Sequence, residues 1–171
     1  EQLHRTGTKE GCAEGDCGAC VIMVGELNAA GTGVDYVPTN ACIQLLPSLD
    51  GKSVKTVESL KKADGTLHPV QDEMVKCHGS QCGFCTPGIV MSLVNLVQTN
   101  TAPNRQEITD ALSGNLCRCT GYAPIINAAA KACEKKSALK VDDSADVPLL
   151  KEIKRASTPT MSLDGEIIVQ P

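Results

Sequence analysis

The chain has 171 residues, a formal net charge of −4 and a sequence pI near 5.4. No cluster of Lys or Arg stands out along it, so nothing in the composition suggests a nucleic-acid partner. Only 2% of the residues are aromatic, which leaves few large side chains for a hydrophobic core. Small domains with a small hydrophobic core are usually stabilised by disulfides or by a bound metal. The ten cysteines of this chain could form disulfides or bind metal.

The cellular compartment decides whether these cysteines form disulfides or bind metal. No segment has the basic-then-apolar pattern of a signal peptide. The most apolar stretch, residues 88–97, is far too short to span a membrane. We therefore expect a cytoplasmic protein with no membrane partner, in which reducing conditions favour metal-bound thiols over disulfides.

The predicted elements change in kind along the chain. Residues 1–66 predict strands at 21–24, 36–43 and 53–57, with a hairpin-like loop at 28–33. Residues 67–136 predict four short helices at 69–77, 88–98, 104–114 and 124–136. Pro69, Pro87 and Pro124 each mark the start of a helix. Asn104 and Glu107 suit a capping box at the start of the third helix. Residues 137–171 lack a clear period and are expected to form a linker or a surface-wrapping extension. The fold class is α+β.

Cys12, Cys17, Cys20 and Cys42 form the first cysteine group. Their spacing, C-x4-C-x2-C followed by a distant Cys, is that of plant-type [2Fe–2S] ligands. Three thiolates from one loop can converge only if the backbone takes unusual φ angles, and Gly11, Gly15 and Gly18 supply that freedom. On spacing alone, a zinc site or disulfides remain alternatives.

Cys82, Cys85, Cys117 and Cys119 form the second group, as C-x2-C and C-x-C. Each pair precedes a predicted helix, whose N-terminus favours the negative charge of thiolates around iron and sulfide. Taken alone, this pattern suits zinc equally well. Beside the first group it predicts a second [2Fe–2S] cluster.

The remaining sequence offers no chemistry on a substrate. Cys77 and Cys133 fall in predicted helices and are expected to be inert, buried thiols. No C-x-H pairing suggests a Rieske centre. No nucleotide-binding glycine loop or Ser-His-Asp group is present, so we expect no catalytic residue in this chain and a role in electron transfer.

Three long motifs and one short one stand out in the chain: residues 7–20 (GTKEGCAEGDCGAC), 78–88 (HGSQCGFCTPG), 114–122 (GNLCRCTGY) and 67–71 (LHPVQ). They resemble the xanthine dehydrogenase family of molybdenum hydroxylases. The first is similar to the family's first-cluster loop, the second and third are similar to its second-cluster motifs, and residues 67–71 match as well. The resemblance implies a ferredoxin-like β-grasp [2Fe–2S] domain at 1–66, a four-helix [2Fe–2S] domain at 67–136, and at 137–171 a linker towards a FAD-binding domain.

The family begins with two strands and most of a helix before the region that matches residues 7–20. Only residues 1–5 stand there in this chain. The resemblance therefore implies that the β-grasp domain is N-terminally truncated and that its sheet lacks strands, with its core exposed unless another chain covers it.

The resemblance also implies a role for the chain. Electrons from a molybdenum–pterin cofactor, released on hydroxylation of hypoxanthine or xanthine, would pass through the helical-domain cluster and then the ferredoxin-like cluster to FAD and NAD. Gln81 and Cys119 would lie near molybdopterin, and Glu14 and Gly15 near FAD. The implied partners are a molybdenum-cofactor-binding large subunit and a FAD-binding domain or subunit, in a heteromeric complex. The alternatives are a relative that oxidises aldehydes, carbon monoxide or N-heterocycles, and a zinc-bound structural module.

Overall fold

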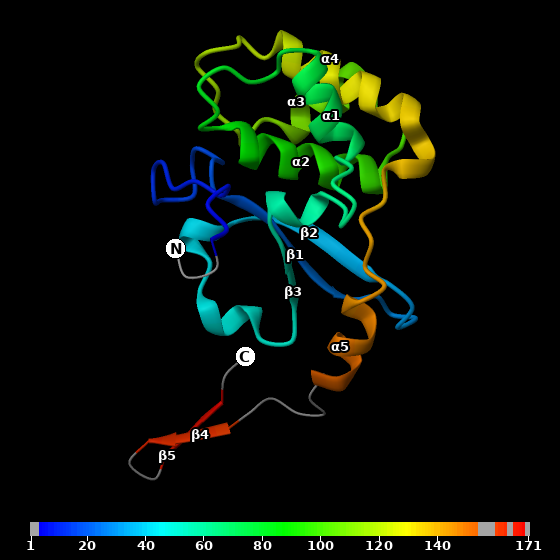
Figure 1. Ribbon diagram of the computed structural model, residues 1–171. Coiled ribbons are helices and arrows are strands. Elements are labelled where there is room, and N and C mark those ends of the chain that lie inside the picture. Colours follow the sequence, from blue (N-terminus) through cyan, green and yellow to red (C-terminus); the bar gives the residue numbers. More distant parts are fainter. Residues whose placement is uncertain (1–3, 154–159, 164–165, 170–171) are drawn as a thin grey trace.

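The computed structural model describes residues 4–153, 160–163 and 166–169 (Figure 1). A three-stranded antiparallel sheet of order β2-β1-β3 carries a layer of helices at one end of the molecule. The strands are β1 (Val21–Leu27), β2 (Val34–Asn40) and β3 (Ser53–Lys55), and the helices of this layer are α1 (Pro69–Lys76), α2 (Thr86–Thr99), α3 (Arg105–Ala111) and α4 (Ala123–Ala132). The predicted α+β class is confirmed.

The central strand β1 is the most deeply buried part of the sheet. Its residues 21–24 are buried, and Met23 is fully enclosed. The loop after β1 turns back through Asn28, whose backbone N–H donates to the carbonyl of Gly33 (2.9 Å) and whose side chain accepts from the N–H of Thr32 (2.9 Å). The predicted strand at 36–43 is too long: β2 ends at Asn40, and residues 41–43 form the short 3-10 helix η1 (Ala41–Ile43).

The predicted helix starts are close to those observed. The side chain of His68 caps α1, with Pro69 as its first residue, and Pro87 and Pro124 lie in the first turns of α2 and α4. The capping box at Asn104 is present: its side chain accepts from the N–H of Glu107 (3.0 Å), whose carboxylate accepts from the N–H of Asn104 (2.6 Å). Helix α3 ends at Ala111, earlier than predicted, and α4 continues into the 3-10 helix η4 (Cys133–Ala138).

Helix α2 joins the sheet to the other helices. It packs on β1 with one side and contacts α1 and α3. One hydrophobic cluster runs from Val21 and Met23 of β1 through all four helices to Leu139. The predicted boundary at residues 66–67 falls between the 3-10 helix η3 (Val57–Leu60) and α1, and the core crosses it.

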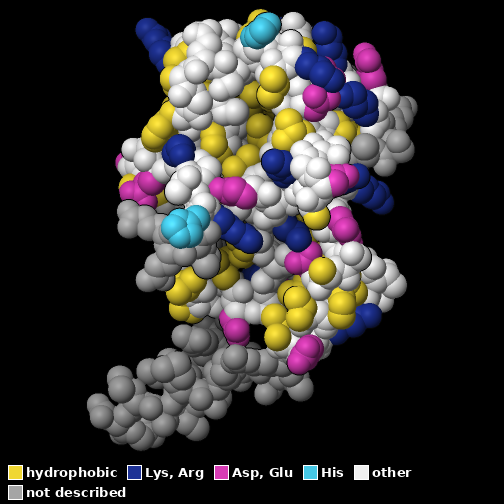
Figure 2. Space-filling view, viewed as in Figure 1, with side chains coloured by type: hydrophobic (Ala, Val, Ile, Leu, Met, Phe, Trp, Pro, Cys, Tyr) yellow, Lys and Arg dark blue, Asp and Glu magenta, His cyan; other side chains and the backbone are white. Residues whose placement is uncertain are grey.

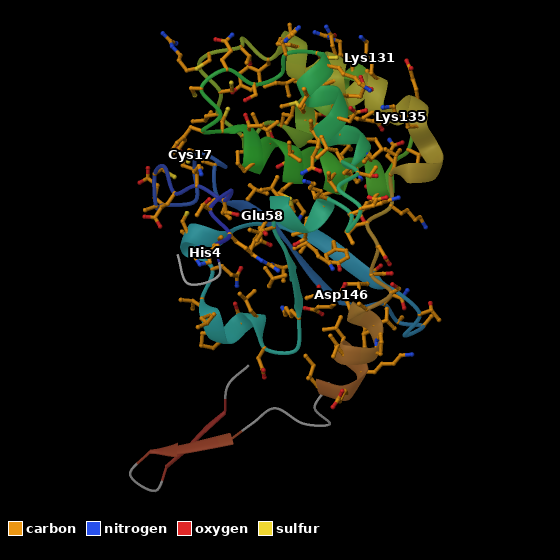
Figure 3. All side chains as sticks on the ribbon, viewed as in Figure 1. His4, Cys17, Glu58, Lys131, Lys135 and Asp146 are labelled. Atoms are coloured by element: carbon orange, nitrogen blue, oxygen red, sulfur yellow. The ribbon has the colours of Figure 1, made fainter. Side chains whose placement is uncertain are left out.

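The segment expected to be a linker contains helix α5 (Asp146–Ile153) and a hairpin of β4 (Thr160–Leu163) and β5 (Glu166–Val169). Asp146 accepts hydrogen bonds from Ser53 (3.0 Å) and Lys55 of β3, and Asp143 accepts from the N–H of Val34 (2.8 Å). These contacts fasten α5 to the sheet, and Figure 3 shows Asp146 at the start of that helix. The helix was missed because only Leu150 among its residues is buried.

The surface shows no single charged region on the face drawn in Figure 2, where Lys and Arg side chains are interspersed with Asp and Glu. Among the residues that the structure describes, no helix is both long enough and apolar enough to cross a membrane.

Candidate iron–sulfur centres

The first candidate centre forms where β1 begins and β2 ends. Val21 of β1 pairs with Asn40 of β2, so Cys20, directly before β1, lies beside η1, which carries Cys42. The N–H of Ala41 also donates to the carbonyl of Cys20 (3.3 Å). Sheet register therefore brings together two thiols that are distant in sequence, and Cys42 reaches the site from a 3-10 helix rather than from a strand.

The four thiols of this centre meet as two pairs. The side chain of Cys12 hydrogen-bonds that of Cys17, and the side chain of Cys42 hydrogen-bonds that of Cys20. Cys42 also interacts electrostatically with Cys12, which links one pair to the other.

Backbone N–H groups favour the thiolate form of Cys12. Its sulfur accepts hydrogen bonds from the N–H of Glu14, of Cys17 (3.3 Å) and of Asp16 (3.3 Å), and these lower the pKa of Cys12 to about 6. The thiolate is the form of cysteine that binds metal. The hydrogen bond with Cys20 raises the pKa of Cys42, as expected for thiols close enough to share one proton.

The loop that carries these thiols depends on glycine at two positions. Gly15 and Gly18 both have left-handed backbone angles, with φ of 81° and 70°. A Cβ at Gly15 would lie 2.7 Å from the side chain of Ile43, and Asn40 holds the same residue by donating to its carbonyl (2.6 Å). The predicted unusual φ is thus found at Gly15 and Gly18, whereas Gly11 does not have a left-handed conformation.

The second candidate centre is built from the loops that precede α2 and α4. The side chain of Cys119 hydrogen-bonds that of Cys82, and the side chain of Cys85 hydrogen-bonds that of Cys117. Electrostatic interactions of Cys85 with Cys82 and of Cys119 with Cys117 link the two pairs. The sequence predicted these four thiols as one set, and the structure brings them together.

The two pairs of this centre differ in exposure. Cys82 and Cys119 are exposed, whereas Cys85 and Cys117 are half-buried. Burial is the main reason that the pKa of Cys85 is raised, to about 12. Burial also acts to raise the pKa of Cys117, but hydrogen bonds from the side chain and backbone of Thr120, the side chain of Cys85 and the backbone of Cys119 together outweigh it, and the net pKa is lowered. One side of the centre therefore faces outwards and the other faces the protein.

Two residues that the sequence reasoning did not single out shape this second loop. The hydroxyl of Tyr122 accepts from the N–H of Cys117 (2.8 Å) and donates to the carbonyl of Asn115 (3.0 Å). The hydroxyl of Thr120 lies 3.2 Å from the sulfur of Cys117. Both residues belong to the motif at 114–122, so that motif could have indicated their role from the sequence.

The two loops are joined directly. The N–H of Leu116 donates to the carbonyl of Cys17 (3.0 Å), and the buried side chain of Asn115 donates to the carbonyl of Gly18 (3.1 Å). A Cβ at Gly88, in the first turn of α2, would lie 2.0 Å from that same Gly18 oxygen. Figure 3 shows Cys17 where the first loop meets the helices. We refer to these contacts between residues 17–18, 88 and 115–116 as the loop junction.

The remaining predicted residues have clear positions. Gln81 is exposed and directly precedes Cys82, while Glu14 is exposed and Gly15 half-buried in the first loop. Their pterin and flavin contacts stay predictions. Cys133 is buried in the hydrophobic cluster, and Cys77 packs against it from the end of α1; neither thiol belongs to the pairs.

The donor set fits [2Fe–2S] chemistry, in which four thiolates bind two irons. All ten cysteines are unpaired thiols rather than disulfides. Within the described ranges, no three His, Cys, Asp or Glu side chains converge on the position of a single metal ion. Eight thiols instead form two sets of two pairs, an arrangement that offers two ligands to each iron.

Comparison with known proteins identifies the family. The chain matches the family described as [2Fe-2S] binding domain over residues 56–130. It is 48% identical over 134 residues to aldehyde oxidase 1 of Macaca fascicularis and to aldehyde oxidase of Homo sapiens, a match that covers 78% of this chain and 10% of each relative. The chain thus spans about a tenth of the length of these relatives.

Comparison with solved structures identifies the same family. Quinoline 2-oxidoreductase from Pseudomonas putida 86 has a chain that aligns with a TM-score of 0.68 at 37% identity, covering 79% of this chain and 78% of that one. Aldehyde oxidoreductase from Desulfovibrio gigas aligns with a TM-score of 0.68 at 34% identity, covering 84% of this chain and 15% of that one. The chain belongs to the molybdenum hydroxylase family, in which it corresponds to the iron–sulfur part.

Proposed function

We propose that this chain transfers electrons inside a molybdenum hydroxylase, through two [2Fe–2S] clusters held by Cys12, Cys17, Cys20 and Cys42 and by Cys82, Cys85, Cys117 and Cys119. The observation that carries the proposal is the meeting of these eight thiols as two sets of two pairs. When bound, each cluster supplies a centre that accepts and releases one electron at a time.

The chain's own residues hold the two centres at a fixed separation. The loop junction ties the first loop to the second through the backbone of Cys17 and Gly18. The residues between the loops pack into the same hydrophobic cluster as β1 and α2. Rigid spacing suits a relay, because no large movement of the loops is then needed for electrons to pass.

Exposure supports an order for the relay. Cys82, Cys119 and Gln81 are exposed at the second centre, where the family resemblance implies a molybdopterin on the partner. Glu14 is exposed on the first loop, where the resemblance implies FAD. Electrons would enter at the helical-domain centre and leave from the first centre towards FAD, with NAD as final acceptor.

The substrate is proposed to be an aldehyde or an N-heterocycle. The relatives named above are aldehyde oxidases, an aldehyde oxidoreductase and a quinoline oxidoreductase, and they favour this alternative over hypoxanthine and xanthine.

The partners are then a molybdenum-cofactor-binding large subunit or domain and a FAD-binding domain or subunit. Ten unpaired thiols favour a cytoplasmic location, since reducing conditions keep cysteines out of disulfides.

Two ligand variants in the whole complex test the proposal. Cys42→Ala should remove the first centre only, so substrate should still reduce the surviving cluster in rapid-mixing spectroscopy while electron delivery to NAD collapses. Cys82→Ala should remove the other centre, so NADH should reduce the surviving cluster through FAD and substrate should not. Equal rates of reduction by substrate in both variants would show that the relay is not linear. An aldehyde, quinoline and xanthine, each used as reductant, would identify the substrate class.

A further inference from the structure

The side chain of Thr120 is the only hydroxyl that the structure places against a candidate ligand sulfur in its described residues, with Oγ1 3.2 Å from Sγ of Cys117. We propose that this hydroxyl donates a hydrogen bond to the iron-bound Cys117 sulfur and so raises the reduction potential of the helical-domain cluster. Thr120 is then a positioning residue that tunes the relay through the Cys117 sulfur. The inference rests on the proposed function to the extent that a cluster occupies this centre.

The neighbouring hydrogen bonds fix the direction of this contact. The backbone N–H of Tyr122 donates to Oγ1 of Thr120 (3.2 Å), which uses a lone pair of that oxygen. A cysteine sulfur that binds iron is a thiolate and carries no proton to give. The Thr120 hydroxyl therefore donates the hydrogen bond, and the Cys117 sulfur accepts it.

The backbone around Thr120 is held in a strained form that keeps the hydroxyl in place. Tyr122 has a left-handed conformation with φ of 68°, which is rare for a bulky side chain. Such conformations persist where the surroundings over-determine them, and they gather at functional sites. Here the Tyr122 hydroxyl is fixed by the N–H of Cys117 and the carbonyl of Asn115. The Tyr122 hydroxyl thus holds the backbone of Cys117 while the Tyr122 N–H holds Thr120 Oγ1, and one residue fixes both ends of the Thr120–Cys117 contact.

The sign of the effect follows from charge. Reduction adds one negative charge to the cluster and its sulfurs, so a hydrogen-bond donor stabilises the reduced form more than the oxidised form. Cys117 belongs to the half-buried pair of the centre, where weaker screening makes such a bond stronger than at the surface. Loss of the hydroxyl should therefore lower the potential and make electron entry less favourable.

Thr120→Val tests the inference because it replaces the hydroxyl by a methyl group of similar size. Thr120→Ser keeps the hydroxyl and serves as the matched control. The backbone N–H of Thr120, which also hydrogen-bonds the Cys117 sulfur, is present in both variants. Potentials are measured on the whole complex by titration with dithionite and mediators, followed by electron paramagnetic resonance, so that neither substrate nor NAD is needed.

We expect Thr120→Val to lower the midpoint potential of the helical-domain cluster by an amount that changes its electron-transfer equilibrium with the first cluster about tenfold, which is about 59 mV for one electron. The first cluster should keep its potential and acts as an internal reference. Thr120→Ser should match the unsubstituted protein. If Thr120→Val assembles less iron, Thr120→Ala, which introduces no new methyl group, carries the same comparison.

An unchanged potential in Thr120→Val, or an equal shift in Thr120→Ser, would overturn the inference. Failure of the proposed function would look different. The unsubstituted complex would then show no cluster reduction by its substrate, whereas the mediated potentials of the Thr120 variants could still be compared.

Discussion

The backbone N–H of Leu116 donates a hydrogen bond of 3.0 Å to the carbonyl oxygen of Cys17. Cys17 is a candidate ligand of the first centre, and Leu116 directly precedes Cys117, a candidate ligand of the second. One hydrogen bond between main chains thus connects two motifs that lie about a hundred residues apart. The separation of the two centres is set by this backbone contact together with the buried side chain of Asn115, which donates to the carbonyl of Gly18.

Gly88→Ala should damage this junction. A Cβ at Gly88 would meet the Gly18 carbonyl oxygen at 2.0 Å, a clash with main chain that no rotamer change relieves. We expect a loss of about 1–3 kcal/mol in the free energy of unfolding, as for an overpacked core. Denaturant unfolding followed by circular dichroism measures it.

Gly114→Ala is the matched control for this substitution. Gly114 lies in the second loop, is exposed, and a Cβ there would meet nothing within 4 Å. Its stability should stay close to that of the unsubstituted chain. Equal losses in the two variants would mean that crowding at Gly18 does not limit stability.

The loop junction is an example of contacts between distant residues that could not be predicted from the sequence. The cysteine spacing predicted both sets of thiols, because ligand spacing along a chain is a local property. Sequence spacing could not predict how the thiols pair, since Cys20 meets Cys42 through the register of β1 and β2. A glycine in the first turn of α2 was a signal of close backbone approach, but its partner, Gly18, is seventy residues away.

Metal and sulfide analysis of the purified chain tests the donor set. Two [2Fe–2S] clusters contain about four irons and four acid-labile sulfides per chain. Cys77→Ser and Cys133→Ser should keep that content, because both thiols pack in or against the hydrophobic cluster and neither belongs to the thiol pairs. Iron content halved in either variant would mean that the ligand assignment is wrong. Zinc without sulfide would mean that both centres are structural metal sites.

Stability should fall in mild acid because of His68. Its ring is buried: Nδ1 accepts from the N–H of Val70 (3.2 Å), and Nε2 donates to the carbonyl of Leu139 (2.9 Å). Burial lowers the pKa of His68 in the folded protein. The unfolded chain takes up this proton near pH about 6.5. The folded protein resists it, so the stability present above that pH is lost as the pH falls towards the lowered folded pKa.

His68→Asn isolates this effect, since Asn can also cap α1 by accepting from the N–H of Val70. Its unfolding temperature should drop less between pH 7.5 and 5.5 than that of the unsubstituted chain. His78→Asn, at an exposed left-handed position with φ of 55°, is the control and should leave the pH dependence in place. A pH dependence unchanged by His68→Asn would show that another group causes the acid instability.

The helices were easier to predict than the contacts that surround the second centre. Proline at a helix start and the Asn104 capping box act within a few residues, so the sequence predicts them directly. The hydroxyls of Thr120 and Tyr122 act through a left-handed backbone at Tyr122, and no residue-type preference predicts that conformation for a tyrosine. Helix α5 is held by Asp146 on Ser53 and Lys55, which lie 93 and 91 residues away in the sequence, so no local pattern predicts this contact.

Gln81→Ala should slow the entry of electrons into the chain. Gln81 is exposed beside Cys82, and the family resemblance implies that its amide contacts the pterin of the partner. Loss of one polar contact across an interface costs about 0.5–1.5 kcal/mol, so reduction of the helical-domain cluster by substrate should slow about two- to tenfold. Iron content and the mediated potentials should stay unchanged, because the Gln81 side chain is not a candidate ligand. Gln106→Ala, on α3 where the side chain donates to Asp110 (2.8 Å), is the matched control and should leave the rate unaltered. Rapid mixing of the whole complex with substrate measures both rates, and equal rates would mean that the second loop meets its partner without this amide.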